Sequence, residues 1–338
     1  MSPRQVSFSA LQYLLKLSYS IESEDQEKAA IELATLVEST VFPTVSFGPI
    51  AHALCHLVSS TNRTVACFSA RALKLLLLDD SLRSQVGTTG ISKAVVSAMK
   101  HWEEEVLCIR ELLGVLQTLC WDRQCVSAVL SPDIISYLVG YMQASDDDVN
   151  VLALCTIANI LYYSDTIILD ADGLSFELCK AMPVLVKIVR ATQHRSMRFY
   201  SMAAIANASA HASLAKALVE IDALEVCEEQ EKQSLGKNIA FGSKLSICAH
   251  AAATALRKHI GDMESGTGNT GASAFAGLSI LSGGSEKYNF KWGKEPAMRI
   301  ELDPGLKTKN TNAFIFALIV WGSIIMWTFF PALKGAQS

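Results

Sequence analysis

The chain has 338 residues, a formal net charge of -4 and a pI near 6.0, with 50% hydrophobic and 18% charged residues. A chain of this length can bury a sizeable core, and its charged fraction is low for an ordinary soluble protein. Binding to nucleic acid depends on dense clusters of Lys and Arg, and the sequence has none. Composition therefore argues against a nucleic-acid partner.

The first element expected along the chain is an N-terminal helix or cap in residues 1–26. Ser7 to Ile21 is apolar, rich in serine and free of acidic residues, as some mitochondrial targeting segments are. Lys16 interrupts this run, and the leucines have the spacing of one helical face: Leu11, Leu14, Leu15 and Leu17. The segment is therefore interpreted as the first helix of a domain.

Residues 27–260 contain an internal repeat. Helical stripes rich in leucine and small residues recur, with spacings of 43, 41 and 48 residues between the equivalent positions Leu73, Leu116, Ile157 and Ile205. A second apolar helix precedes each stripe. The longest spacing predicts an insertion around Asp170 to Glu177. Each repeat is thus predicted to be a helix, a turn, a longer helix and a connector.

Short polar turns separate the two helices of each repeat, at residues 59–63, 103–105, 145–148 and 192–196. Their Ser, Thr, Asn and Asp side chains can cap the following helix by accepting its free N–H groups. The densest acidic run, Asp146 to Asp148, lies in one of these turns, where acidic groups favour the positive end of the next helix. We therefore interpret this run as a turn and not as a catalytic or metal site.

This pattern resembles the armadillo repeat, which has three helices, a period of about 42 residues and a final stripe similar to ALxNL. HEAT repeats have nearly the same length and are the alternative. The resemblance implies an all-α fold, a right-handed α-solenoid of about five repeats. Ala29 to Leu36 resembles the last helix of a degenerate first repeat, and Ala249 to His259 resembles a terminal one. Stacks of this kind expose one long concave surface.

The resemblance also implies a peptide-binding groove. Armadillo proteins that grip extended peptides carry an Asn on the third helix of successive repeats, and this Asn hydrogen-bonds the peptide backbone. Asn159 and Asn207 match that position, and Lys74 and Gln117 are the nearest long polar side chains in the earlier repeats. A carboxamide both donates and accepts, so it can satisfy an amide unit of any sequence.

One departure from the armadillo pattern and one alternative role for the Asn residues qualify this groove. The aromatic residue that nuclear-import armadillo proteins carry one turn earlier is here Cys155 or Ala203, which argues against recognition of basic nuclear-localisation peptides. The alternative role for Asn159 and Asn207 is to cap or cross-link helices locally.

Residues for catalysis or metal binding are sparse. The sequence has no P-loop, no GxSxG and no kinase-like set, so we expect no enzyme and no cofactor. His52 and His56 share a helical face with Cys55 between them, but no third ligand is evident, so no metal site is expected. The nine cysteines are scattered singly without a CxxC pair, which predicts reduced core thiols in a cytosolic domain and no disulfide framework or zinc site.

A change in composition follows the repeats. Residues 261–311 are rich in Gly, Ser and Thr at their start and are predicted to be a flexible linker. Within it, Lys287 to Lys294 mixes rings and cations, as juxtamembrane segments do. The predicted interface residues are Lys287, Tyr288, Phe290, Lys291 and Trp292. An ordinary loop or a short strand that pairs with a partner is the alternative.

The last element is an uncharged run of eighteen residues, Ala313 to Phe330. At about 1.5 Å per residue it can cross a hydrocarbon core of roughly 30 Å, so a transmembrane helix is predicted over residues 312–333, with 334–338 as a short tail. Its large apolar side chains include Phe314, Trp321, Trp327 and Phe330. A buried core helix is the alternative interpretation of this run.

These elements predict a non-enzymatic, tail-anchored adaptor. It would hold the bilayer through its C-terminal helix and present a concave binding groove for a protein or peptide on the cytosolic face of an organelle membrane. The mitochondrial outer membrane is slightly favoured over the endoplasmic reticulum. The alternative is a structural accessory subunit of a membrane-embedded complex, whose anchor packs on partner helices.

Overall fold

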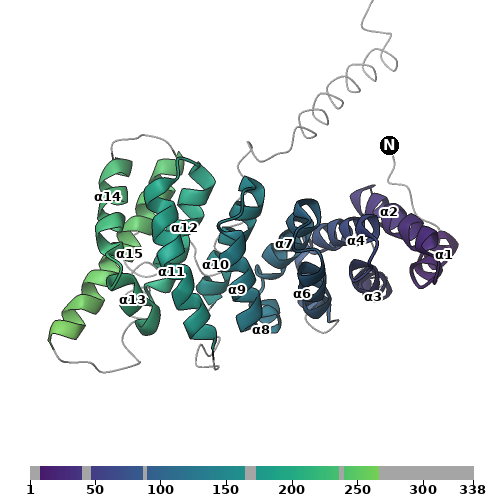
Figure 1. The fold of residues 1–338 in the computed structure, drawn as a ribbon, viewed down its shortest axis with the longest axis horizontal. Coiled ribbons are helices and arrows are strands. Elements are labelled where there is room, and N and C mark those ends of the chain that lie inside the picture. Colours follow the sequence, from purple (N-terminus) through teal and green to yellow (C-terminus); the bar gives the residue numbers. More distant parts are fainter. Residues whose placement is uncertain (1–7, 40–46, 87–89, 164–172, 236–239, 266–338) are drawn as a thin grey trace, which may run out of the picture. The chain divides into compact units, whose positions relative to one another are not determined.

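The computed structural model describes residues 8–39, 47–86, 90–163, 173–235 and 240–265. The chain divides into two units, Met1–Ala297 and Met298–Ser338, and every described residue belongs to the first. All regular secondary structure in the described residues is α-helical (Figure 1). The predicted all-α class is confirmed for this part of the chain.

Six of the described helices pack one against the next and form what we call the third-helix row. These helices are α2 (Ser23–Ser39), α4 (Arg63–Leu76), α7 (Val106–Leu119), α10 (Asp147–Tyr163), α12 (Arg195–Ala208) and α15 (Ala240–Glu264). They include the leucine-rich and small-residue stripes from which the repeat was predicted.

Each helix of the row packs against the preceding long helix of its own repeat. These partners are α1 (Phe8–Ser18), α3 (Phe47–Val58), α6 (Ile91–His101), α9 (Pro132–Tyr141), α11 (Leu174–Ala191) and α14 (Ala223–Leu235). Short connector helices precede three of them: α5 (Asp80–Val86), α8 (Arg123–Val129) and α13 (Ala212–Val219). The described part therefore has six helix pairs where about five repeats were predicted, because α1, predicted as a cap, pairs with α2.

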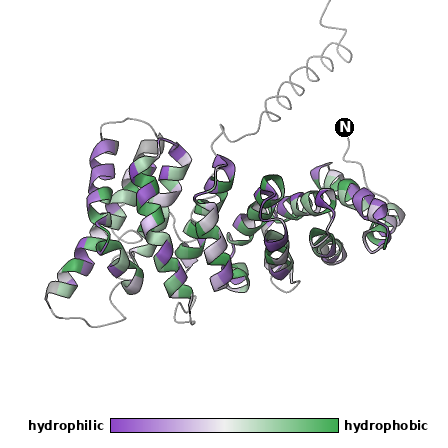
Figure 2. Ribbon diagram, viewed as in Figure 1, coloured by the Kyte–Doolittle hydropathy of each residue, from purple (hydrophilic) through white to green (hydrophobic). Residues whose placement is uncertain are grey.

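Burial follows the amphipathic pattern of the helices. In α4 the side chains of Val65, Ala66, Ala70 and Leu73 are buried while Arg71 is exposed. Figure 2 shows hydrophobic and hydrophilic residues on the same helices, as an apolar stripe that faces a core requires. By contrast, α10 is buried around most of its circumference, because it packs against α7, α9 and α12.

Side-chain caps begin three helices of the row: an Asn and an Asp, as predicted for these polar turns, and a His, which was not predicted. The Asn62 side chain accepts from the backbone N–H groups of Thr64 and Val65. Asp146 Oδ1 accepts from the N–H of Val149 at 3.0 Å, and His194 Nδ1 accepts from the N–H of Met197 at 3.3 Å. The turn at 103–105 differs, because Glu105 makes no side-chain cap and instead forms an ion pair with Arg63.

The insertion predicted around residues 170–177 overlaps the start of α11. This helix has 18 residues, whereas the corresponding α6 and α9 have 11 and 10. It begins after Gly173, whose φ of 91° lies in the left-handed region that favours glycine. Part of the extra length of this repeat is therefore helix.

One disulfide corrects the prediction of reduced thiols. Cys67 on α4 is bonded to Cys108 on α7, with their Cα atoms 5.0 Å apart. The two positions lie 41 residues apart, close to one repeat, so the packing of neighbouring third helices brings them together. The other seven cysteines are free, and all except Cys55 and Cys179 are buried.

None of the described helices is long and apolar enough to cross a membrane. The predicted anchor at 312–333 and the tail at 334–338 lie outside the described residues. So does the linker beyond residue 265, with all of its predicted interface residues. At the start of the linker, α15 continues to Glu264, beyond the predicted repeat boundary at 260.

Candidate functional site

The four predicted groove residues lie on four successive helices of the third-helix row: Lys74 on α4, Gln117 on α7, Asn159 on α10 and Asn207 on α12. Lys74, Asn159 and Asn207 are partly exposed, whereas Gln117 is only 6% exposed. The row thus presents a polar side chain from each of four neighbouring repeats.

A buried thiol joins three of these helices. Gln117 Nε2 donates to Cys155 Sγ at 3.4 Å, and Asn159 Nδ2 lies 3.9 Å from the same sulfur. Burial raises the pKa of Cys155 to about 11, while hydrogen bonds from Gln117, Tyr200 and Asn159 act in the opposite direction. The thiol is therefore a neutral hydrogen-bond acceptor between α7, α10 and α12.

The sequence analysis treated Cys155 only as a missing aromatic residue and overlooked Tyr200. Two spacings in the sequence could have indicated that Cys155, Asn159 and Gln117 lie close together. Cys155 lies four residues before Asn159, which puts both on one face of α10, and Gln117 lies 42 residues before Asn159.

Asn207 cross-links two repeats. Its Nδ2 donates to the backbone carbonyl of Ala158 at 2.9 Å and so ties α12 to α10. Within the described residues, neither Asn207 Oδ1 nor Asn159 Oδ1 accepts a hydrogen bond. Each carboxamide uses its N–H group inside the protein and keeps one partly exposed acceptor.

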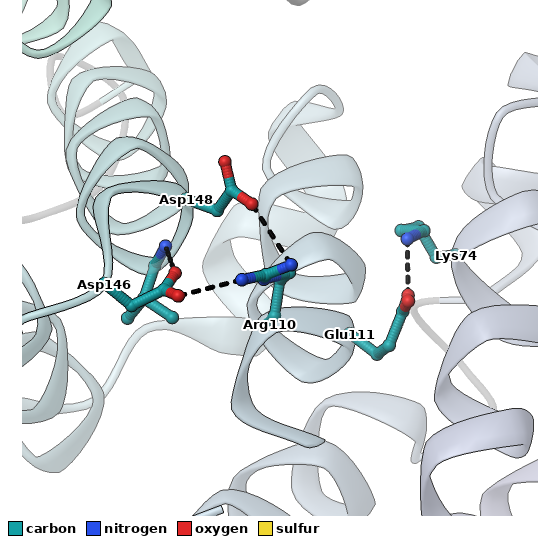
Figure 3. A network of polar contacts seen from close by, with 6 residues as sticks. Lys74, Arg110, Glu111, Asp146 and Asp148 are labelled. Atoms are coloured by element: carbon teal, nitrogen blue, oxygen red, sulfur yellow. Dashed lines mark hydrogen bonds and ion pairs between the residues drawn. The ribbon is translucent and has the colours of Figure 1, made fainter. Parts of the chain in front are cut away.

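Lys74 crosses from α4 to α7. Its Nζ forms an ion pair with Glu111 (Figure 3). Its alkyl chain passes over Gly114. A Cβ added to Gly114 would lie 2.5 Å from Lys74 Cδ, so the missing side chain makes room for this path. The cation predicted to face a ligand is therefore held by a neighbouring repeat.

The same pairing of charges continues along the row. Arg110 on α7 binds Asp146 at 2.8 Å and Asp148 at 3.1 Å (Figure 3). Among the described helices of the row, two further pairs connect neighbouring repeats, Arg71 with Glu38 at 2.6 Å and Arg63 with Glu105 at 3.2 Å. Exposed pairs of this kind contribute about 0–1 kcal/mol each, so their main effect is to neutralise the row.

The histidines predicted not to bind metal lie on α3. His52 and His56 are both exposed, and the His56 ring stacks on Tyr19 with ring centroids 5.2 Å apart. Among the residues that the structure describes, no group of three or more His, Cys, Asp or Glu side chains could hold a metal ion.

Comparisons with solved structures identify the fold. An engineered protein superimposes with a TM-score of 0.60 at 22% identity, covering 74% of this chain and 97% of that one. A designed armadillo repeat protein gives a TM-score of 0.58 at 16% identity, with coverage of 73% and 99%. A second designed armadillo protein, in complex with the peptide (KR)4, gives 0.55 at 16% identity, with coverage of 72% and 99%. No protein-family model matches the sequence, and no curated protein matches it significantly.

The described part of the chain is therefore an armadillo-like α-solenoid of about 15 helices.

Proposed function

We propose that this protein is a non-enzymatic adaptor whose third-helix row binds an extended peptide segment of a partner protein. The observation that carries the proposal is the pair of carboxamide oxygens without an internal partner in the described part of the chain, Asn159 Oδ1 and Asn207 Oδ1, which belong to partly exposed side chains on successive helices of the row. An extended peptide presents backbone N–H groups along one edge, and such acceptors can pair with them without reading the side chains.

The likeness to a designed armadillo protein in complex with a peptide supports this use of the fold. The charges of the row support a peptide of low charge. Lys74, Arg110 and Arg71 each pair with a carboxylate of a neighbouring repeat, which leaves little net field to attract a charged ligand.

The second part of the proposal concerns location. The uncharged run Ala313 to Phe330 is long enough to span a bilayer and supports a C-terminal anchor, with the solenoid in the cytosol. The cation and ring pattern of Lys287 to Lys294 supports contact with the membrane interface. We favour the mitochondrial outer membrane slightly over the endoplasmic reticulum.

A peptide selection tests the binding function. Full-length protein in detergent is used to select ligands from a library of random, unstructured peptides, and the dissociation constant of a selected peptide is measured by fluorescence anisotropy. Asn159→Ala should weaken binding by about 5- to 150-fold, which corresponds to roughly 1–3 kcal/mol for a partner N–H left unpaired. Because the internal contact of Asn159 is a long one to sulfur, this substitution should barely change stability.

Gln124→Ala is the matched control, since Gln124 is an exposed carboxamide on the connector helix α8, outside the row. It should leave the affinity unchanged. Failure to select any peptide, or equal affinities for wild type and Asn159→Ala, would reject the third-helix row as a peptide site.

A further inference from the structure

Two ion pairs and one disulfide connect α4 with α7, and they follow one another in the same order along both helices. The ion pair of Arg63 with Glu105 comes first, the disulfide of Cys67 with Cys108 second, and the ion pair of Lys74 with Glu111 last. We call the interface of these two helices the α4–α7 seam. Among the described residues, this disulfide is the one covalent cross-link between helices. The two ion pairs connect the same helices and do not depend on it.

We propose that Cys67 and Cys108 are a reversible thiol-oxidation site: oxidation adds a covalent cross-link to the α4–α7 seam, and reduction leaves the two ion pairs and the packing of the helices to hold it. This goes beyond the proposed binding function and does not depend on it. The disulfide joins two neighbouring repeats of the row. It therefore restrains Lys74 on α4 relative to Gln117 on α7.

The two cysteines differ in accessibility, which assigns their roles. Cys67 is partly exposed and can meet an oxidant, whereas Cys108 is 1% exposed. Cys108 lies in the first turn of α7, where the partial positive charge of a helix N-terminus stabilises a thiolate. Its sulfur also lies 3.8 Å from the carbonyl oxygen of Arg63, one turn before Cys67. Cys67 is therefore the residue that reacts first with the oxidant, and Cys108 is the resolving residue, which attacks the Cys67 sulfur in the mixed disulfide.

The chemistry balances with a small disulfide such as oxidised glutathione as the oxidant. The Cys67 thiolate attacks one sulfur of glutathione disulfide, forms a mixed disulfide and releases one glutathione. The Cys108 thiolate then attacks the Cys67 sulfur and releases the second glutathione. Two protein thiols lose two protons and two electrons, and the oxidant is reduced to two glutathione molecules. Excess glutathione runs the same steps in reverse.

Six of the other seven cysteines have a raised thiol pKa. Burial raises the pKa of Cys55, Cys227 and Cys248 to about 12 and that of Cys155 to about 11. Burial also raises the pKa of Cys120 and Cys179. A thiol with a raised pKa stays protonated near neutral pH and reacts slowly with disulfides. These six thiols should therefore stay reduced, and Cys125 is buried. A mild oxidant should accordingly act first on the bonded pair, Cys67 and Cys108.

The test uses full-length protein equilibrated with glutathione buffers over a range of ratios. Free thiols are trapped by alkylation, and the fraction of the cross-linked Cys67–Cys108 peptide is measured by mass spectrometry. We expect this fraction to rise reversibly with the oxidised share of glutathione while the other seven cysteines remain reduced. Oxidation should raise Tm by about 5–15 °C, because the cross-link closes a loop of 41 residues.

Cys67→Ser should give the same Tm in oxidising and reducing buffer, whereas Cys55→Ser, which removes a partly exposed free thiol, should keep the full difference. If Cys67→Ser does not fold, the titration of the wild type still decides. The proposal is overturned if the cross-link never forms, or if it persists at the most reducing ratio, which would make it a permanent structural bond.

Discussion

Gly114 determines where a charged side chain of the third-helix row can lie. Glycine in a helix interior is destabilising by up to about 1 kcal/mol relative to alanine. Here it provides the space through which Lys74 reaches Glu111. Gly140 on α9 is a useful comparison, because a Cβ there would meet no atom within 4 Å.

We therefore expect Gly140→Ala to raise the free energy of unfolding by about 0.5–1 kcal/mol, and Gly114→Ala to raise it by less, because Lys74 must move. In a Lys74→Ala background, Gly114→Ala should show the full gain. Urea unfolding of the four variants measures this. Equal gains from Gly114→Ala with and without Lys74 would show that Lys74 does not occupy this path.

Asn207 shows what single residues in a sequence do not reveal. Its match to the armadillo Asn predicted a side chain facing a ligand, yet its N–H group binds the carbonyl of Ala158, which lies 49 residues earlier. That contact depends on the packing of α12 against α10, so the residues near Asn207 in the sequence cannot predict it. Asn207→Ala should accordingly cost about 1 kcal/mol of stability, so Asn159 is the cleaner position for a binding test.

At the scale of helices, repeat spacing predicted the fold because each repeat must bury its stripe on the next one. The third-helix stripes and the polar turns fell at the predicted places. The disulfide did not follow from the scattered cysteines, although the separation of Cys67 and Cys108 equals about one repeat. Register on the facing helices α4 and α7, and not spacing alone, decides which pairs meet.

The ion pairs between helices predict that the row prefers peptides of low charge to basic peptides. Because Arg110 pairs with both Asp146 and Asp148 and leaves the three groups a net charge of only -1, a labelled peptide of alternating Lys and Arg should bind full-length protein at least about 10-fold more weakly than a selected peptide of low charge. Arg110→Gln frees both carboxylates and should strengthen binding of the basic peptide. Fluorescence anisotropy at low and moderate salt measures both effects. Tight, salt-sensitive binding of the basic peptide to wild type would contradict this charge balance.

At the scale of the whole molecule, the proposed C-terminal anchor determines whether the protein is attached to a membrane. Removing residues 312–338 should move the protein from the membrane pellet to the soluble fraction after cell lysis, because the deletion takes away the predicted transmembrane helix. Retention in the pellet would mean that Lys287 to Lys294 or a partner protein holds the chain. Retention caused by a partner would favour an accessory subunit over an adaptor.

The central claim is that the third-helix row is the surface that binds a partner. Hydrogen–deuterium exchange of the full-length protein, with and without a selected peptide, tests it most directly. We predict that the peptide slows exchange most in α7, α10 and α12, which carry Gln117, Asn159 and Asn207. Protection centred on α6, α9 and α11, with the row unchanged, would contradict the account.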